Sequence, residues 1–348
     1  MYETKLQELE LISQAVGNSP CYVQGGGGNT SVKLDQTTMA VKASGYRLNQ
    51  VTSKDGFVLV NYPNIAGYYR TVDVNSGLDF EKDSVEFVKK NMVEVPGHQN
   101  LRPSIEAGFH SILKTHVIHT HPVYANILCC AANGQELAQK ICGGQSYNYL
   151  WIPYIKPGFT LTLKIQSELE RLLQQGQRYP QVIFMENHGL IVTADDPRQC
   201  IDLHRQVNDT IRSALDLTGP FPEIKLEPLD KATFKSKTDF VADFFKGSHL
   251  TRAFFDTVLY PDQMVYLNEY VGVNTDDHKL NINSATGEVI YKTNYPEALA
   301  IEETLVAFLY VILMLKAKSL TVKTMSGEES DFIKNWEGEK YRRSLLQK

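Results

Sequence analysis

The segment HVIHTHPV, residues 116–123, constrains the fold more than any other part of the chain. Alternate side chains of a strand point to the same face, so His119 and His121 would present two imidazoles side by side. Pro122 ends the strand directly after them and suits the first position of a helix, which we expect over residues 122–132. Open α/β sheets usually carry their sites at such strand ends. The segment therefore predicts an α/β layer with two histidines at a site-forming edge.

The remaining pattern predicts two units. In the first, which ends near residues 217–220, we expect helices over 3–16, 104–114 and from 196 onward, and strands over 38–42, 56–60, 181–186 and 190–193. After Pro220 we expect a linker and then a second unit from about residue 238. Its expected elements are a helix near 240–246, short strands around 264–267 and 288–292, a long helix from Pro296 and a terminal helix through Trp336.

Composition excludes several classes of protein. The 348 residues are 43% apolar and 22% charged, which is typical of a soluble globular chain. The net charge of −5, without a basic block, argues against a nucleic-acid partner. Five cysteines without a paired spacing, and no signal peptide, predict a reduced, cytoplasmic protein. The apolar run at residues 305–315 is about half the length that a membrane span needs, so we expect a buried helix and no membrane partner.

A third histidine strengthens the interpretation of the pair as metal ligands. His188 lies in VIFMENHGLIV, residues 182–192, the most strand-like sequence in the chain. A histidine in such a setting can be a hydrogen-bonded core residue, and a lone His-x-His pair can arise by chance. Three neutral imidazoles with one exchangeable position, however, are typical of a catalytic zinc site.

Glu106 is the candidate acid/base. At the start of a helix a carboxylate is unremarkable, because the helix dipole favours acidic residues in the first turn. If its side chain points toward the histidines, Glu106 can act as general base and occupy the open metal position at rest. We interpret His110, four residues later, as a structural partner of Glu106 on the same helix.

The run QGGGGNTS, residues 24–31, is the remaining signal. It lacks the spacing and the Gly-Lys of a nucleotide-binding P-loop. Consecutive small residues can still form a concavity of N–H groups for an anion. Side-chain donors for a phosphate would come from Asn29, Thr30 and Ser31, with Ser44, Gly45 and Ser104 completing the pocket. Each of these residues, taken alone, is also an ordinary turn residue.

Taken in order, these segments resemble the class II aldolase/adducin family over roughly residues 5–217. The matching residues are Gly28-Asn29-Thr30-Ser31, Ser44-Gly45, Pro103-Ser104-Ile105-Glu106, His119-Thr120-His121-Pro122 and Asn187-His188-Gly189. The short interval between Glu106 and the histidine pair is most similar to the aldolase portion of bifunctional rhamnulose-1-phosphate aldolase/dehydrogenase proteins. YPDQMVYLN and NWEGEKYRRSL also resemble the segment that follows that portion.

The resemblance implies a three-layer α/β/α sandwich over residues 1–219. The sequence pattern adds a smaller C-terminal α/β domain, residues 220–348, whose role it does not assign; its long helix favours packing or oligomerisation, and we expect no chemistry there. The resemblance also implies Zn²⁺ or another divalent metal on His119, His121 and His188, with Glu106 as the catalytic acid/base. Gly28, Asn29, Ser44, Gly45 and Ser104 match phosphate-binding positions. Ile105 stands where simple aldolases often have a second serine, so one phosphate-binding hydroxyl is missing.

The implied reaction is reversible cleavage of a ketose 1-phosphate, of the rhamnulose- or fuculose-phosphate type, to dihydroxyacetone phosphate and an aldehyde. The implied assembly is a homo-oligomer, a tetramer in many relatives. A further possibility is that the chain is one half of a two-component system and passes an aldehyde to a separate dehydrogenase. Two alternatives stay open: a phosphosugar 4-epimerase or dehydratase on the same metal site, and a non-catalytic, adducin-like interaction module. The retained histidines and glutamate argue against the module. The sequence does not assign the family's catalytic tyrosine among eighteen tyrosines.

Overall fold

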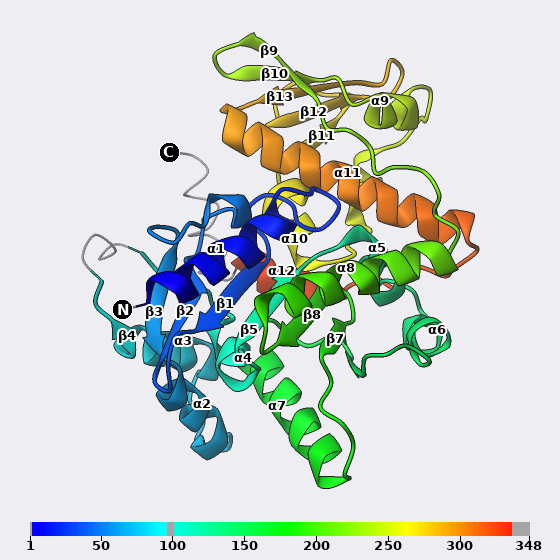
Figure 1. The fold of residues 1–348 in the computed structure, drawn as a ribbon. Helices are drawn as coiled ribbons and strands as arrows, with labels where there is room; N and C mark the ends of the chain where they lie inside the picture. The colour runs from blue at the N-terminus through cyan, green and yellow to red at the C-terminus, as the bar shows by residue number, and fades with distance from the viewer. Residues whose placement is uncertain (1, 96–100, 336–348) are drawn as a thin grey trace.

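An eight-stranded sheet forms the centre of the computed structural model, which describes residues 2–95 and 101–335 (Figure 1). The strands are Asn29–Lys33 (β1), Thr38–Lys42 (β2), Phe57–Asn61 (β3), Met92–Val93 (β4), His116–Thr120 (β5), Tyr149–Ile152 (β6), Val182–Met185 (β7) and Gly189–Ala194 (β8). Their order across the sheet is β4-β3-β2-β1-β5-β8-β7-β6, antiparallel throughout except for the parallel pair β6 and β7. The strand with the histidine pair, β5, is therefore central, between β1 and β8.

Helices cover both faces of this sheet, which confirms the expected α/β/α sandwich (Figure 1). One face carries Glu3–Gly17 (α1), Val123–Cys129 (α5), Gly134–Cys142 (α6) and Pro197–Ala214 (α8). The other carries Tyr62–Thr71 (α2), Phe80–Lys90 (α3), Ala107–Ile112 (α4) and Phe159–Gln174 (α7). A short 3₁₀ turn, Leu48–Gln50 (η1), follows β2.

The pleat of β5 divides its side chains between the two layers of core. Val117 packs with Phe109 of α4 and Ile165 of α7, whereas Ile118 belongs to the core beneath α1, α5 and α8. Both side chains are fully buried, and each such burial stabilises the fold by about 1.5–3 kcal/mol. A one-residue slip would exchange the two faces, so this packing fixes the register. The register places His119 on the α4 side, at the end of the strand.

A second sheet lies in the C-terminal part of the chain (Figure 1). Its strands are Leu226–Asp230 (β9), Thr233–Ser236 (β10), Val271–Val273 (β11), Leu280–Asn283 (β12) and Glu288–Lys292 (β13), in the order β11-β12-β13-β10-β9. The helices here are Asp239–Phe245 (α9), Arg252–Asp256 (η2, 3₁₀), Pro261–Gln263 (α10), Met264–Asn268 (η3, π), Tyr295–Ala317 (α11) and Gly327–Asn335 (α12). Helix α11 packs against α5 on one side and β10 on the other, so a single apolar core continues across both parts.

Helix α11 has the length and the apolar composition of a membrane span, with a mean hydropathy of 2.1 over its most apolar window. Of that window, 78% is buried inside the protein. Asn294 caps the helix by accepting the backbone N–H of Glu297, and Pro296 occupies its first turn. This burial fits the buried core helix that the sequence predicts at residues 305–315.

The C-terminal part differs from expectation in two places. Residues 264–267, expected as a strand, form the π-helical turn η3, because Pro261 starts a helical segment directly before them. A short apolar run such as Met264–Asn268 has no periodicity that separates a strand from a buried helical turn. Strands β9 and β10 lie in the passage after Pro220 that we expected to be a linker. The expected terminal helix is α12, which is described as far as Asn335; Trp336 lies outside the described residues.

The protein is expected to lose stability as the pH falls below about 6.5, the usual pKa of histidine. His204 of α8 lies against Thr120, with 2.7 Å between Nε2 and Oγ1, and burial lowers its pKa to about 3. Between these two pKa values the unfolded chain takes up a proton that the folded chain does not, so acid favours unfolding. For His204 alone the loss between pH 7 and pH 5 is about 2 kcal/mol. Urea unfolding at both pH values measures it.

The His204→Gln variant tests the origin of this loss. Its free energy of unfolding should fall between pH 7 and pH 5 by about 2 kcal/mol less than that of the wild type. His249→Asn is the control, because His249 is exposed and asparagine tolerates its left-handed φ of 53°. An unchanged pH dependence in His204→Gln would show that another group is responsible.

Candidate metal centre

The histidine pair lies where β5 ends. His119 is opposite Asn29 of β1 and Ile191 of β8, and His121 follows the last residue of the strand. Their Nε2 atoms are 3.2 Å apart. His119 is fully buried and His121 is 5% exposed. The side-by-side arrangement expected from the alternation of the strand is therefore present.

His188 joins the pair from the turn between β7 and β8. Its ring centroid is 5.0 Å from that of His119 and 5.4 Å from that of His121. One nitrogen from each ring can be chosen so that all three lie within 4.8 Å of one another. Asn187, just before His188, has a φ of 48° and so turns the chain sharply. The three histidines predicted as metal ligands thus converge from two separate segments.

The hydrogen bonds of the pair fix which ring nitrogen carries the proton. His119 Nδ1 lies 3.0 Å from the carbonyl oxygen of Leu190, which can only accept, so Nδ1 holds the proton. His121 Nδ1 donates in the same way to the carboxylate of Asp262, at 2.5 Å. In the neutral form that binds metal, both rings therefore carry a lone pair on Nε2, and no proton lies between the two atoms. Two lone pairs facing each other at 3.2 Å suit a shared cation.

The distances between these atoms fit a tetrahedral ion. Two nitrogens that each lie about 2.0–2.1 Å from zinc are roughly 3.3 Å apart in tetrahedral geometry. The Nε2 atoms of His119 and His121 match this separation. Burial lowers the pKa of His119 to about 4 and that of His188 to about 3, so both rings are neutral near pH 7. Neutral imidazole is the form that binds metal.

Glu106 lies beside the imidazoles, as the residue that precedes α4. Its Oε2 is 3.5 Å from His119 Nε2, and its Oε1 is 3.4 Å from His188 Nε2. Burial alone would raise the pKa of Glu106, but the imidazoles of His119 and His188 and the amide of Asn29 lower it to about 2. Oε2 accepts from Asn29, whereas the buried Oε1 has no hydrogen-bond partner. A carboxylate oxygen is therefore directed at the histidines without a donor of its own.

Asn29 holds Glu106 in place. Its Nδ2 donates to Glu106 Oε2 at 2.7 Å and to Ser104 Oγ at 3.2 Å. Its Oδ1 bonds His110 Nε2, and His110 Nδ1 bonds Ser31 Oγ at 2.7 Å. His110 is therefore structural, as expected. Its hydrogen bonds connect it to Glu106 through Asn29, whereas we expected a direct contact within one helix, because Glu106 precedes α4.

The predicted phosphate-binding residues divide into two groups. Asn29 and Ser104 are buried and already bonded to the glutamate segment. Ser44 and Gly45 are partly exposed, in the loop after β2. Lys42 connects that loop to the glycine run, because its Nζ donates to the carbonyl oxygens of Gly26 and Tyr46.

Gly28, the last of the predicted phosphate residues, has a φ of 62°. A Cβ there would lie 2.6 Å from the carbonyl oxygen of His119. The position therefore needs glycine to let the loop approach β5, whether or not a phosphate binds.

Sequence reasoning missed Asp262 of α10. Its Oδ2 accepts the Nδ1 proton of His121 across 141 residues of sequence, and the residue is 1% exposed. The segment that contains it was noticed only for its resemblance, and no chemistry was expected in the C-terminal part. The one local signal is an acidic residue directly after Pro261, which is also ordinary for a helix start.

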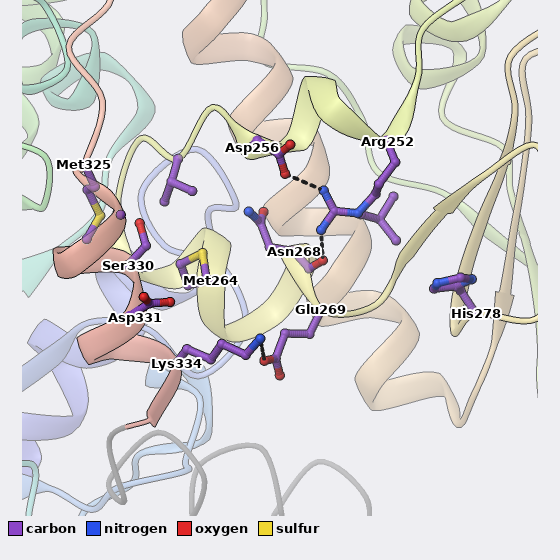
Figure 2. Close-up of a pocket in the computed structure, with 13 residues that line it drawn as sticks. Arg252, Asp256, Met264, Asn268, Glu269, His278, Met325, Ser330, Asp331 and Lys334 are labelled. Atoms are coloured by element: carbon purple, nitrogen blue, oxygen red, sulfur yellow. Dashed lines mark hydrogen bonds and ion pairs between the residues drawn. The ribbon is translucent and has the colours of Figure 1, made fainter.

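A pocket of about 650 Å³ lies in the C-terminal part and includes none of the three histidines (Figure 2). Figure 2 shows two of its charged pairs: Arg252 bonds Asp256 and the carbonyl oxygen of Asn268, and Lys334 pairs with Glu269. These four charged side chains therefore have partners within the chain.

Comparison with known proteins bears on the family and the fold of the chain. A sequence model of the family described as the class II aldolase and adducin N-terminal domain matches residues 13–215. The uncharacterized oxidoreductase YuxG of Bacillus subtilis (strain 168) is 27% identical over 241 residues, which are 63% of this chain and 32% of that protein. The chain thus spans about a third of the length of this curated relative.

Among solved structures, the N-terminal class II aldolase domain of a conserved protein from Thermoplasma acidophilum is similar to this chain. Its TM-score is 0.50 at 24% identity, over 60% of this chain and 92% of that one. The L-fuculose-1-phosphate aldolase from Thermus thermophilus has a TM-score of 0.38 at 13% identity, over 62% and 99%. The first likeness supports the fold, and the second is too distant to bear on the reaction.

Proposed function

The chain belongs to the class II aldolase and adducin N-terminal domain family, and from this premise we propose that it is a divalent-metal-dependent aldolase. Its substrate would be a ketose 1-phosphate of the rhamnulose- or fuculose-phosphate type, cleaved reversibly to dihydroxyacetone phosphate and an aldehyde. One observation carries the proposal. Two buried Nε2 lone pairs, on His119 and His121, face each other at 3.2 Å next to His188 and the carboxylate of Glu106.

His119, His121 and His188 would hold the metal, and zinc is the ion that three imidazoles with an open fourth position favour. When bound, the ion would act as a Lewis acid on the carbonyl oxygen of the substrate. Glu106 would move the proton. In the direction of synthesis its Oε1 takes a proton from the carbon next to the carbonyl, and in the direction of cleavage it returns that proton. Asn29 keeps Oε2 occupied, which leaves Oε1 for this role.

For the phosphate we propose Ser44, Gly45 and the backbone around Gly28, because these positions lie in the two loops that Lys42 connects. Asn29 and Ser104, predicted as phosphate ligands, would serve mainly to position Glu106. A phosphate anchored there would hold the reacting carbon near the histidines, and this orientation supplies part of the rate.

The partners are proposals of the same kind. We propose residues 1–219 as the catalytic part and residues 220–348 as a packing or oligomerisation part of a cytoplasmic homo-oligomer, a tetramer by analogy. A separate dehydrogenase would consume the aldehyde. This partner is supported by the name of YuxG, which describes an oxidoreductase. The region that matches this chain is 32% of the length of YuxG.

The test is release of dihydroxyacetone phosphate from L-rhamnulose 1-phosphate and from L-fuculose 1-phosphate, with and without chelator. We expect release from at least one sugar, its loss with chelator, and its return when zinc is added back. No release from folded, zinc-loaded protein would contradict the aldolase. Conversion of either sugar phosphate to an isomer without cleavage would identify the epimerase alternative.

A further inference from the structure

The C-terminal part of the chain contacts the segments that carry two of the three histidines. Asp262 bonds His121. Asn187, the neighbour of His188, donates through its Nδ2 to the carbonyl oxygens of Leu259 and Lys323, each at 2.8 Å. The region matched by the family model ends at residue 215, so these contacts come from outside it.

The bond between Asp262 and His121 sets the state of the ring. The carboxylate can only accept, so it holds the proton on Nδ1 and leaves Nε2 as a lone pair toward His119. Metal-bound histidines almost always donate their other N–H to a carboxylate, a carbonyl or water, and such partners fix the ring and raise its basicity. His119 has the carbonyl of Leu190 as this partner, and His121 has Asp262.

The glycine run accommodates this carboxylate. A Cβ at Gly27 would lie 2.3 Å from Asp262 Oδ2, a distance that no side chain could occupy without displacing the carboxylate. Gly27 has no left-handed φ, and the next contact of such a Cβ, with the carbonyl oxygen of Gln24, would be longer at 3.0 Å, so Asp262 is the tighter of the two constraints on this position. The carboxylate of Asp262 can occupy its position only because residue 27 has no side chain.

A second carboxylate fastens the same loop. Glu303 of α11 accepts the backbone N–H of Gly25 at 2.8 Å and forms an ion pair with Arg47. Glu303 is 4% exposed. The backbone N–H of Gly25 and the space beside Gly27 are therefore taken by acidic side chains of this same chain, whereas Gly28 contacts neither carboxylate in this way.

We propose that Asp262 is a positioning residue of the metal centre: it orients His121 for the ion, and the C-terminal part of the chain is thereby a component of that centre. This inference rests on the proposed metal site. Imidazoles bind a metal in their neutral form, so the formal charges of Glu106 and Asp262 would balance those of one divalent cation bound there. Loss of the Asp262 charge should therefore weaken the binding of the metal as well as the orientation of the ring.

The first test is Asp262→Asn, which keeps the shape of the side chain. Zinc affinity, measured by competition with a chromogenic chelator, should fall about 10- to 100-fold. The visible spectrum of the cobalt-loaded protein should change, because the ligand field at His121 changes. The melting temperature of the metal-free variant controls for folding. Asp256→Asn is the matched control, since Asp256 is in a nearby segment and its side chain is 73% exposed.

The second test approaches the contact from the other side. Gly27→Ala should displace Asp262 and lower zinc affinity by a similar factor. In an Asp262→Ala background, Gly27→Ala should lower zinc affinity little further, because the carboxylate that it would displace is absent. This double-mutant cycle isolates the contact between the two residues. Gly67→Ala is the control, because a Cβ at Gly67 in α2 meets nothing within 4 Å.

The outcomes separate the two proposals. Wild-type protein that binds no divalent metal would overturn the proposed function and this inference with it. Wild-type protein that binds zinc, with Asp262→Asn or Gly27→Ala of equal affinity, would overturn the inference alone. A variant with a lower melting temperature and unchanged affinity and cobalt spectrum would assign Asp262 to folding only, and would likewise overturn it.

Discussion

Glu106→Gln is expected to keep its zinc and to lose about 10²- to 10⁴-fold in the rate at which it exchanges the carbon-bound proton of dihydroxyacetone phosphate with solvent. Glutamine preserves the size of the side chain, and its amide oxygen can still accept from Asn29. It cannot take up a proton at the position of Oε1. Deuterium uptake from D₂O, followed by proton NMR, measures the exchange, and elemental analysis measures the zinc.

Two comparisons make this result specific to Glu106. Glu86→Gln removes a carboxylate of α3 that is 48% exposed and pairs with Lys89, so exchange should continue at the wild-type rate. Full exchange in Glu106→Gln would remove the glutamate from its proposed role. If Glu106→Gln instead lost both its zinc and the proton exchange, Glu106 would be a required metal ligand.

The double variant His119→Ala, His121→Ala is expected to bind no zinc and to release no dihydroxyacetone phosphate. It removes the two Nε2 atoms that face each other at 3.2 Å, and His188 alone cannot replace them. Zinc should stabilise the wild type by about 2.7 kcal/mol when present at 100 times its dissociation constant, and should not stabilise the variant. Thermal melts with and without zinc measure the difference.

The matched control for this variant is His116→Gln. His116 lies on the same strand, is fully buried, and bonds Glu8 through Nε2 at 2.8 Å, away from the other three histidines. That change should leave the zinc content intact, although it alters a buried side chain. Stoichiometric zinc in the double variant would rule out the proposed ligand set, whatever the effect on activity.

Local pattern predicted the strands β2, β3, β5, β7 and β8 of the large sheet but not β1, β4 and β6, and β1 is the direct neighbour of β5. The strand Thr38–Lys42 has the expected bounds, and β5 ends one residue before the expected His121. Alternation along β5 also predicted correctly that His119 and His121 lie side by side, because the pleat fixes that geometry within a few residues. The approach of His188 and Glu106 followed from the family resemblance, which carries tertiary information that the residues alone do not.

The parts that were missed depend on distant contacts. Asp262 meets His121 across 141 residues, and a single sequence holds no sign of that pairing. Asn29 was predicted as a phosphate ligand, yet its side chain is bonded to Glu106, Ser104 and His110, which come together only in the folded chain. The turn at Met264–Asn268 was mistaken for a strand because four apolar residues fit either structure when buried.

The contact between Gly25 and Glu303 spans 278 residues, and this separation sets an order of events during synthesis. A ribosome makes the chain from its N-terminus, so all three histidines and Glu106 exist before Glu303 has been translated. At that stage neither Asp262 nor Glu303 is present to contact the glycine run. In the finished protein the same histidines are at most 5% exposed. The metal centre that we propose would therefore gain its contact with Asp262 only after the C-terminal part of the chain has been translated.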